Sequence, residues 1–333
     1  MSLHAVEAID DAVDATRAFL WPFDRGRWGR LALIVFFVGG AGGFPGFQFS
    51  GGSPGGTSPE APSVSNPADA VSSIGGPELA VIAAVFGVVL LLVLGFAFVG
   101  SVMEFVLFES LRQESVTIRE YWRRRWRQGV RLFGFRILLG VLTLGTFGAL
   151  AVAVLSPVVF GDGGLSIALL VVALPVFLVV LLVSSLVDGF TTVFVVPVMI
   201  VEDRRLLSAW RRFWPTLTEH WKQYAAYVVL RFVLGIVAGI LTGIGTVLGA
   251  IAIGIPLGIV AAVGVGLLGV AEIIGWAVIA LVAALFVLGL LVIGLLVAVP
   301  VKTYFRYYAL FVLGDTNDAF DLIADRRRTV RSE

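Results

Sequence analysis

The side chains of this sequence that could do chemistry are mainly arginines, and many of them lie in one stretch. Residues 118–136 read IREYWRRRWRQGVRLFGFR and hold seven arginines in nineteen residues. On a helix, residues three or four apart share a face, so this stretch presents an aromatic stripe beside a basic one. Arginine forks match phosphate oxygens, and the candidate anionic-lipid contacts in this stretch are Trp122, Arg123, Arg124, Trp126 and Arg127.

A weaker copy of this pattern occurs later in the chain, where WRRFW stands in place of WRRRW. It adds four candidate lipid contacts, Trp210, Arg211, Arg212 and Trp214. The apolar segments that follow such stretches open with arginine, at Arg30, Arg136 and Arg231. These matches predict three repeats, each an amphipathic helix that leads into a transmembrane hairpin.

Three functions are open for the basic stretch. It can anchor a span at the membrane interface, bind a specific anionic lipid or protein partner, or bind nucleic acid. A nucleic-acid binder normally carries its basic surface on a separate module with a recognisable motif, and none is present. The expected partners are therefore the lipid bilayer and its anionic headgroups, and no nucleic acid.

Asp188 is the acidic residue that lies deepest in an apolar segment. It precedes Glu202 by 14 residues, about 21 Å along a continuous helix, which places it near the middle of a membrane. Arg136 and Arg231 open neighbouring apolar segments and are its candidate partners, so these three residues form a possible intramembrane polar site. An ionisable residue at this depth is either a proton or cation site or part of a structural ion pair. The sequence leaves both open and favours the structural pair.

Several kinds of chemistry have no residues to support them. The chain has no cysteine, and its two histidines, His4 and His220, have no metal-ligand spacing around them. It has no Gly-x-Ser-x-Gly and no Walker motif. We therefore expect no enzyme activity, no catalytic residue, no cofactor and no metal.

The composition is that of a membrane protein. Hydrophobic residues make up 59% of the chain and charged residues only 14%, against roughly 25% charged in ordinary soluble domains. Crossing a bilayer takes about 20 apolar residues. Apolar segments of about that length or longer occupy residues 31–47, 79–108, 132–160, 165–201 and most of 224–301. Because backbone inside a membrane must satisfy its own hydrogen bonds, these segments predict an all-α, polytopic transmembrane helical bundle.

The distribution of basic residues predicts six spans. All 24 lysines and arginines lie before residue 31 or within residues 112–136, 204–231 and 302–331. The connections at 45–78, 156–165 and 250–272 contain none. Basic loops stay cytoplasmic, so we expect a multi-pass protein of the cell membrane with both termini in the cytoplasm. The segment 251–271 must then enter and leave on the external side, as helix extensions or as a re-entrant hairpin broken at Gly254 and Pro256.

A single transmembrane domain, residues 1–333, is expected, with five segments outside the membrane. These are a cytoplasmic amphipathic helix at 1–27, a flexible external loop at 48–77, cytoplasmic juxtamembrane helices at 109–131 and 202–223, and a cytoplasmic tail at 314–333. The first 27 residues lack the pattern of a cleavable signal peptide, so the first apolar segment is interpreted as a retained span.

The first amphipathic helix is acidic. Its apolar face is predicted to hold Leu3, Val6, Ile9, Val13 and Leu20, opposite Glu7, Asp10, Asp11 and Asp14. An anionic leaflet would repel these carboxylates. We expect the acidic face to lie against the arginine-rich helix at 118–136 instead.

Two stretches carry a resemblance to known proteins. LWPFDRGRWGRLALIVFFVGG at 20–40 and PVMIVEDRRLLSAWRRFW at 197–214 resemble a group of haloarchaeal six-helix membrane proteins of unknown function. The second stretch is also distantly similar to the membrane domain that accompanies some glycerophosphodiester phosphodiesterases. The resemblance implies a membrane-embedded helical fold, and it supplies no catalytic residue for this chain.

The leading function predicted from the sequence is non-enzymatic: membrane organisation, or an accessory role in lipid metabolism or transport. The alternative is a small-solute or ion permease that uses Asp188 in the fourth span. The glycines at 235, 239, 243, 245 and 249 would line its fifth span, although such spacing is more typical of helix packing. An intramembrane enzyme would need a second carboxylate or a histidine at the depth of Asp188.

Overall fold

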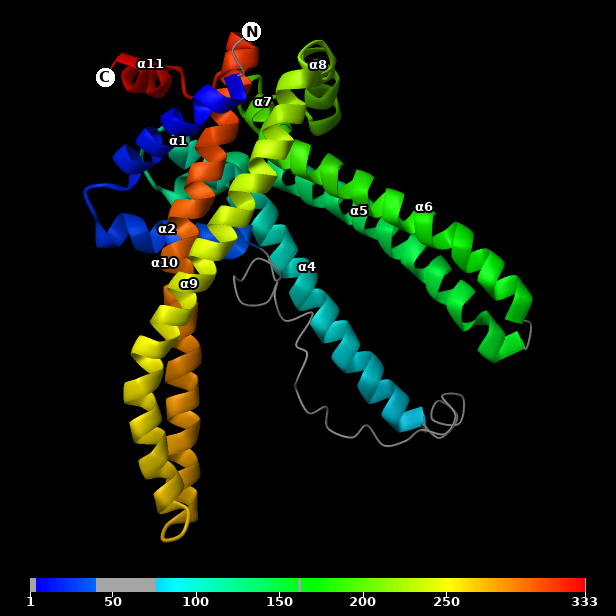
Figure 1. Cartoon of the computed structure of the whole chain (residues 1–333), viewed down its shortest axis with the longest axis vertical. Helices are drawn as coiled ribbons and strands as arrows, with labels where there is room; N and C mark the ends of the chain where they lie inside the picture. The colour runs from blue at the N-terminus through cyan, green and yellow to red at the C-terminus, as the bar shows by residue number, and fades with distance from the viewer. Residues whose placement is uncertain (1–3, 40–75, 161–162, 333) are drawn as a thin grey trace. The chain divides into compact units, whose positions relative to one another are not determined.

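The computed structural model describes residues 4–39, 76–160 and 163–332 (Figure 1). Regular structure in these ranges is entirely helical. The elements are α1 (His4–Leu20), α2 (Arg25–Val38), α4 (Gly76–Arg112), α5 (Ile118–Phe160), α6 (Gly163–Phe190), the π-helical turn η1 (Thr191–Val195), α7 (Val196–Val201), α8 (Leu206–Glu219), α9 (Trp221–Leu267), α10 (Glu272–Thr316), the 3-10 turn η2 (Asp318–Phe320) and α11 (Ala324–Ser332). The predicted all-α fold is confirmed for this part of the chain.

Five helices in the described ranges are long and apolar enough to cross a membrane. They cover Leu79–Arg112, Ile118–Val152, Val171–Val201, Trp221–Leu267 and Glu272–Thr316. Large apolar side chains on them point away from the protein, as lipid-facing side chains do; Leu91, for example, is 71% exposed. The first predicted span is described only as far as α2 and Gly39, so six spans stay a prediction. Nearly all of the predicted loop at 48–77 lies outside the described residues, and α4 begins at Gly76.

The segment 251–271 continues the helices on either side of it. α9 runs through Gly254 and Pro256 to Leu267, and α10 begins at Glu272 after a short turn. The helix-extension alternative is therefore the observed one, and the break at Gly254 and Pro256 is wrong. Cross-helix contacts explain why the two helices stay together: a Cβ on Gly249 would lie 2.7 Å from Ile293 Cδ1.

The predicted glycine stripe is only partly a packing surface. Gly249 packs against Ile293, and a Cβ added to Gly245 would lie 3.5 Å from Val297 Cγ2. Added Cβ atoms on Gly235, Gly239 and Gly243 would meet nothing within 4 Å. Close packing of α9 against α10 therefore begins at Gly245. At the first three glycines, no neighbouring helix of the described structure packs against this side of α9.

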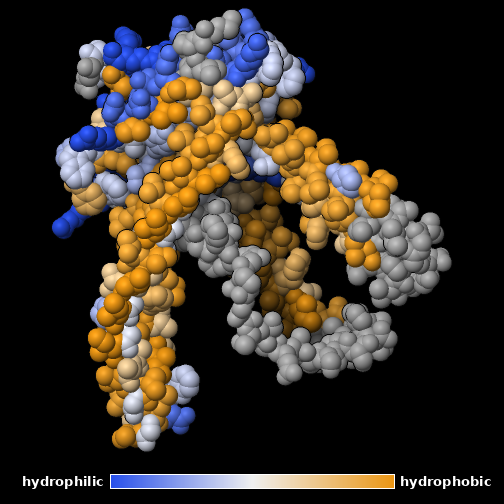
Figure 2. Space-filling model, in the orientation of Figure 1, coloured by the Kyte–Doolittle hydropathy of each residue, from blue (hydrophilic) through white to orange (hydrophobic). Residues whose placement is uncertain are grey.

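The chain divides into two compact units, each described here by itself. Unit 1 consists of residues 1–34, 101–236 and 299–333, and unit 2 of residues 35–100 and 237–298. The core of unit 1 is built from helix ends, at residues 101–111 of α4, 191–200 of η1 and α7, and 306–313 of α10. Within unit 1, α5 and α6 run side by side as a hairpin, and hydrophilic residues gather over α1, α8 and α11 (Figures 1 and 2).

The buried face of α1 differs from the predicted one. Alanines at 5, 8, 12 and 15, together with Phe19, are buried, whereas Val6 and Val13 are each 48% exposed. Of the other predicted members, Leu20 is buried and Leu3 lies outside the described residues. The small alanine side chains let α1 approach α10 closely, and Tyr308 of α10 donates a hydrogen bond to the Ala5 carbonyl at 2.8 Å. The prediction chose the larger apolar side chains, but backbone proximity selects the smaller ones here.

The acidic side of α1 contacts α11 instead of the arginine-rich helix. Asp11 Oδ2 lies 2.8 Å from Arg331 Nη2, and Asp10 and Asp14 are exposed. The predicted pairing with residues 118–136 is therefore wrong. The partner of this side of α1 is α11, whose Arg331 forms the ion pair with Asp11.

The predicted juxtamembrane helices also have different boundaries. α4 continues to Arg112, and α5 begins at Ile118 and runs without a break to Phe160. The predicted helix at 202–223 corresponds to a separate element, α8, which ends at Glu219 before α9 begins. The arginine-rich stretch is thus the first part of a 43-residue helix, so it has the same orientation as the rest of that helix.

Candidate functional site

A partly buried polar cluster centred on Arg136 lies among the apolar helices of unit 1. Its Nε donates to Asp188 Oδ1 at 3.1 Å, and its Nη2 donates to Thr192 Oγ1 at 2.9 Å. Longer contacts join the same guanidinium to Glu104 Oε1 at 3.5 Å and Ser101 Oγ at 3.4 Å. Arg136 of α5 thereby joins α4 to the junction of α6 and η1.

Glu104 is the most deeply buried acid of this cluster. Its side chain is 3% exposed, and its Oε2 accepts a hydrogen bond from Arg306 Nη2 at 2.6 Å. The Arg306 guanidinium lies 5.1 Å from the centre of the Phe108 ring. Two arginines and two carboxylates are therefore in direct contact, and the positive charges of Arg231 and Lys302 lie nearby. Sequence reasoning missed this pair, because its two members lie 202 residues apart.

Asp188 and Arg231 are not in contact. Arg231 Nη1 donates to the Tyr227 hydroxyl at 2.7 Å, and its guanidinium lies 5.5 Å from the Phe305 ring centre. Of the two candidate partners of Asp188, the structure brings only Arg136 to it. The Asp188 side chain remains 41% exposed, and the π-helical turn η1 begins three residues later.

The arginines of the basic stretch divide into an inner and an outer group. Arg125 is buried and lies 3.2 Å from Glu109 Oε2 and 3.6 Å from Asp203 Oδ1. Gly129, on the same inner side, allows α5 to approach α4, since an added Cβ would lie 2.9 Å from Val102 Cα. With this side packed inward, the opposite side of α5 faces outward.

The outer group consists of five exposed arginines, which we call the arginine face: Arg119, Arg123, Arg124, Arg127 and Arg131. None of the five forms an ion pair with an acidic side chain among the residues that the structure describes. Trp126 and Val130 lie between them and are 44% and 40% exposed. Trp122 is half-buried at the edge of the face. The predicted lipid contacts on α5 are thus brought together on one side of one helix.

The matching residues of α8 do not all point outward. Trp210 is half-buried, and its indole N–H donates to Thr191 Oγ1 at 3.0 Å. Arg212 Nε lies 3.2 Å from Glu202 Oε1. Arg211 is exposed, and Trp214 is 57% exposed. Trp210 and Arg212 therefore attach α8 to its neighbours in unit 1, whereas Arg211 and Trp214 can meet a membrane surface.

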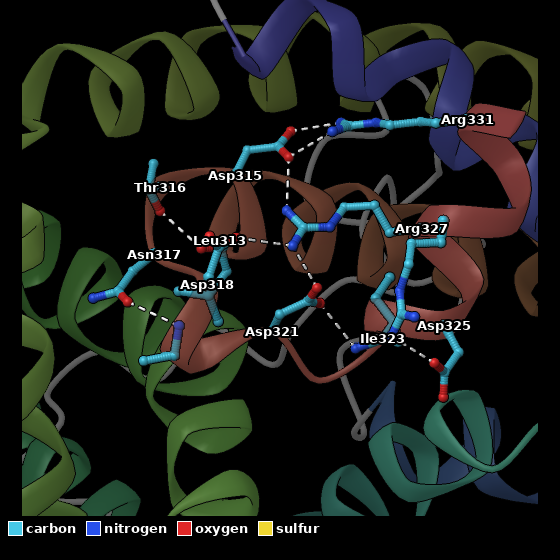
Figure 3. A network of polar contacts seen from close by, with 12 residues as sticks. Leu313, Asp315, Thr316, Asn317, Asp318, Asp321, Ile323, Asp325, Arg327 and Arg331 are labelled. Carbon is cyan, nitrogen blue, oxygen red and sulfur yellow. Dashed lines mark hydrogen bonds and ion pairs between the residues drawn. The ribbon is translucent and has the colours of Figure 1, made fainter.

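The C-terminal arginines contrast with the arginine face because acids surround them (Figure 3). Asp315, 5% exposed, lies 2.9 Å from Arg327 Nη1 and 2.7 Å from Arg331 Nη2. Hydrogen bonds from Arg331 to Asp315 and Asp11 raise the pKa of Arg331 further above its usual value. Burial raises the pKa of Asp321, which contacts Arg327, and the positive charge of Arg327 only partly opposes this. α11 is thereby attached both to the end of α10 and to α1.

An acid at the end of a long helix pairs with a later arginine in three places. Glu109 pairs with Arg125 and Asp315 with Arg331, in both cases 16 residues on, and Glu202 pairs with Arg212, 10 residues on. The helices differ around these pairs, because α5 is continuous whereas α8 and α9 are separate. The threefold repeat stays a prediction.

Among the described residues, no group of three or more histidines, aspartates or glutamates could hold a metal ion. The fold and its charge arrangement fit an integral membrane protein with several apolar helices and a polar helical unit. A model described as "Family of unknown function (DUF7544)" matches residues 3–323, and the chain belongs to that family. No curated protein and no solved structure matches it.

Proposed function

We propose that the protein is a non-enzymatic integral membrane protein whose arginine face binds anionic lipid headgroups. It would act in membrane organisation or as an accessory to lipid metabolism or transport. The observation that carries the proposal is the lack of acidic partners for the five arginines of this face in the described structure, although acids pair with the arginines of α10 and α11. Phosphate groups of a leaflet would supply the missing negative charge.

The magnitudes support binding to a surface. A basic residue near an anionic leaflet contributes about 1 kcal/mol, so several arginines on one helix give strong attraction at low salt. Exposed Trp126 adds an aromatic ring of the kind that prefers the headgroup region. The proposed leaflet is the cytoplasmic one, with six spans and both termini inside, because basic segments stay on that side.

The resemblance of residues 197–214 to the membrane domain accompanying some glycerophosphodiester phosphodiesterases favours a role near lipid metabolism. The resemblance favours only this general type of process. It also favours a haloarchaeal origin of the protein. The chain's own residues supply the lipid-binding argument.

The proposal is tested by energy transfer from tryptophan to a dansyl-labelled phosphatidylglycerol in mixed micelles. Arg124→Gln/Arg127→Gln should reduce transfer to this lipid and leave transfer to dansyl-phosphatidylcholine unchanged. The matched control, Arg17→Gln/Arg205→Gln, removes two exposed arginines outside the arginine face. An equal loss in both double variants would mean that net charge, and not this face, attracts the lipid.

A permease that uses Asp188 is the second candidate, because this carboxylate is 41% exposed and is followed by a π-helical turn. The ion pair between Asp188 and Arg136 argues for a structural role of this carboxylate. Proton flux into proteoliposomes, followed with a pH-sensitive dye, separates the two functions. Flux in the wild type that disappears in Asp188→Asn would favour the permease.

A further inference from the structure

A cavity of about 800 Å³ lies in unit 1 beside the start of α5. Four charged residues line it, Arg30 of α2 and Arg119, Glu120 and Arg123 of α5, together with residues 116–118 that lead into the helix. Elements separated by more than 80 residues of sequence therefore bring three guanidinium groups to one space.

Two hydrogen bonds hold the α2 wall of this cavity in place. Arg30 Nη1 donates to the Val116 carbonyl at 3.0 Å, and Arg27 Nη2 donates to the Glu114 carbonyl at 3.0 Å. Leu31, the residue after Arg30, is fully buried. The opposite wall is helical, so Arg119 and Arg123 lie one turn apart with their Cβ atoms about 6 Å from each other.

The cavity carries uncompensated positive charge. Three arginines and one glutamate line it, which leaves a net charge of two positive units. Arg30, Arg119 and Arg123 form no ion pair with any acid of the described structure. Arg30 uses one N–H on Val116, and its remaining N–H groups are available to a ligand.

We propose that this cavity binds one phosphomonoester group. A phosphomonoester carries up to two negative charges and three terminal oxygens, which match the net charge of the cavity and the forked donors of its arginines. Backbone N–H groups in the first turn of α5 add further donors beside the arginines. A phosphodiester has one negative charge and two such oxygens, so it leaves one positive charge uncompensated.

The phosphomonoester comes from a lipid headgroup. Arg30 directly precedes the apolar sequence Leu-Ala-Leu-Ile-Val, which places the cavity at the depth where an apolar segment enters a membrane. This source rests on the proposed membrane function, whereas the preference for a phosphomonoester rests on the cavity alone. A lipid of the phosphatidic acid type has the required headgroup.

The test measures binding to delipidated full-length protein in a neutral detergent. The probes are dioctanoyl phosphatidic acid, dioctanoyl phosphatidylglycerol and inorganic phosphate, and the readouts are thermophoresis and the stoichiometry in native mass spectra. We expect one phosphatidic acid per chain, bound at least about tenfold more tightly than phosphatidylglycerol, because losing one hydrogen bond to a charged group lowers affinity about tenfold or more. Inorganic phosphate should compete weakly, since it lacks the acyl chains.

The matched variants separate the cavity from arginines elsewhere on the surface. Arg30→Gln/Arg119→Gln should weaken phosphatidic acid binding at least about tenfold, and Arg17→Gln/Arg205→Gln should change it by less than about threefold. Glu120→Gln removes the single acid of the cavity and should tighten binding, an effect that misfolding cannot produce. Arg119→Lys keeps the charge but loses the fork, so its affinity should fall between those of Arg119→Gln and the wild type.

Three outcomes would overturn the inference in distinguishable ways. Equal affinity for the two lipids would remove the preference for a phosphomonoester. Equal damage by the two double variants would replace a discrete site with diffuse attraction. Inorganic phosphate that binds as tightly as the lipid would remove the headgroup source. The proposed lipid-binding function fails separately, if Arg124→Gln/Arg127→Gln leaves energy transfer from dansyl-phosphatidylglycerol unchanged.

Discussion

The outer arginines of α5 and the arginines of α10 and α11 belong to the same unit but have opposite environments. On the outer side of α5, five arginines have no acidic partner in the described structure, and Trp126 and Val130 are exposed among them. In the C-terminal region, Arg306 contacts Glu104, and Arg327 and Arg331 contact Asp315 (Figure 3). This difference shows that a high local density of arginines does not by itself indicate the role of each arginine. The acids that the fold brings near each arginine determine whether it stabilises the protein or remains available to a ligand.

The largest expected effect comes from removing the acid of a paired cluster. Glu104→Gln would leave Arg306 and Arg136 without their shared carboxylate in a buried setting. Breaking a buried pair by removing one partner costs about 3–5 kcal/mol, so we expect a sharp fall in Tm in detergent or loss of folded protein. Glu120→Gln, at an exposed site, is the matched control and should leave Tm unchanged. Similar Tm values for the two variants would show that Glu104 is not a structural acid.

The class of fold could be predicted from the sequence because long apolar segments are a local property of the chain. It did not predict the Glu104–Arg306 pair, because the two residues meet only when α4 and α10 pack. The apolar periodicity of α1 pointed to Val6 and Val13, whereas the buried side is the alanine side that fits against Tyr308. Periodicity identifies an amphipathic helix, but the shape of the neighbouring helix decides which side is buried.

The second effect concerns the attachment of α11. Asp315→Asn removes the charge that holds both Arg327 and Arg331 on the end of α10. Each hydrogen bond to a charged group contributes about 1.5–3 kcal/mol, and exposure of Arg331 to water reduces its share. We expect α11 to detach, so limited trypsin digestion should cleave after Arg327 faster than in the wild type. An unchanged cleavage rate would place the attachment of α11 elsewhere.

A smaller, pH-dependent effect is expected at Asp321. Burial raises the pKa of Asp321, so folding favours its protonated form, and its contribution to stability is lost as pH rises through the folded-state pKa. Asp321→Asn has a neutral side chain at every pH. The wild type should therefore gain stability relative to this variant as pH falls from 7 through the raised pKa, which parallel Tm measurements will show. The opposite trend would mean that the attraction of Arg327 outweighs the cost of burial.

The smallest effect on stability is expected at the arginine face. It tests directly whether these arginines differ from the acid-paired arginines of α10 and α11. Arg124 and Arg127 contact no acid in the described structure, so Arg124→Gln/Arg127→Gln should change the free energy of unfolding by less than about 0.5 kcal/mol in detergent. In anionic vesicles the wild type should be more resistant to unfolding than the double variant, because bound lipid stabilises the folded state. Raising the salt concentration should remove this difference, since exposed charges are screened over about 8 Å at physiological ionic strength. If the double variant lost stability in detergent as well, these arginines would belong with the paired group, and the leaflet would not be their partner.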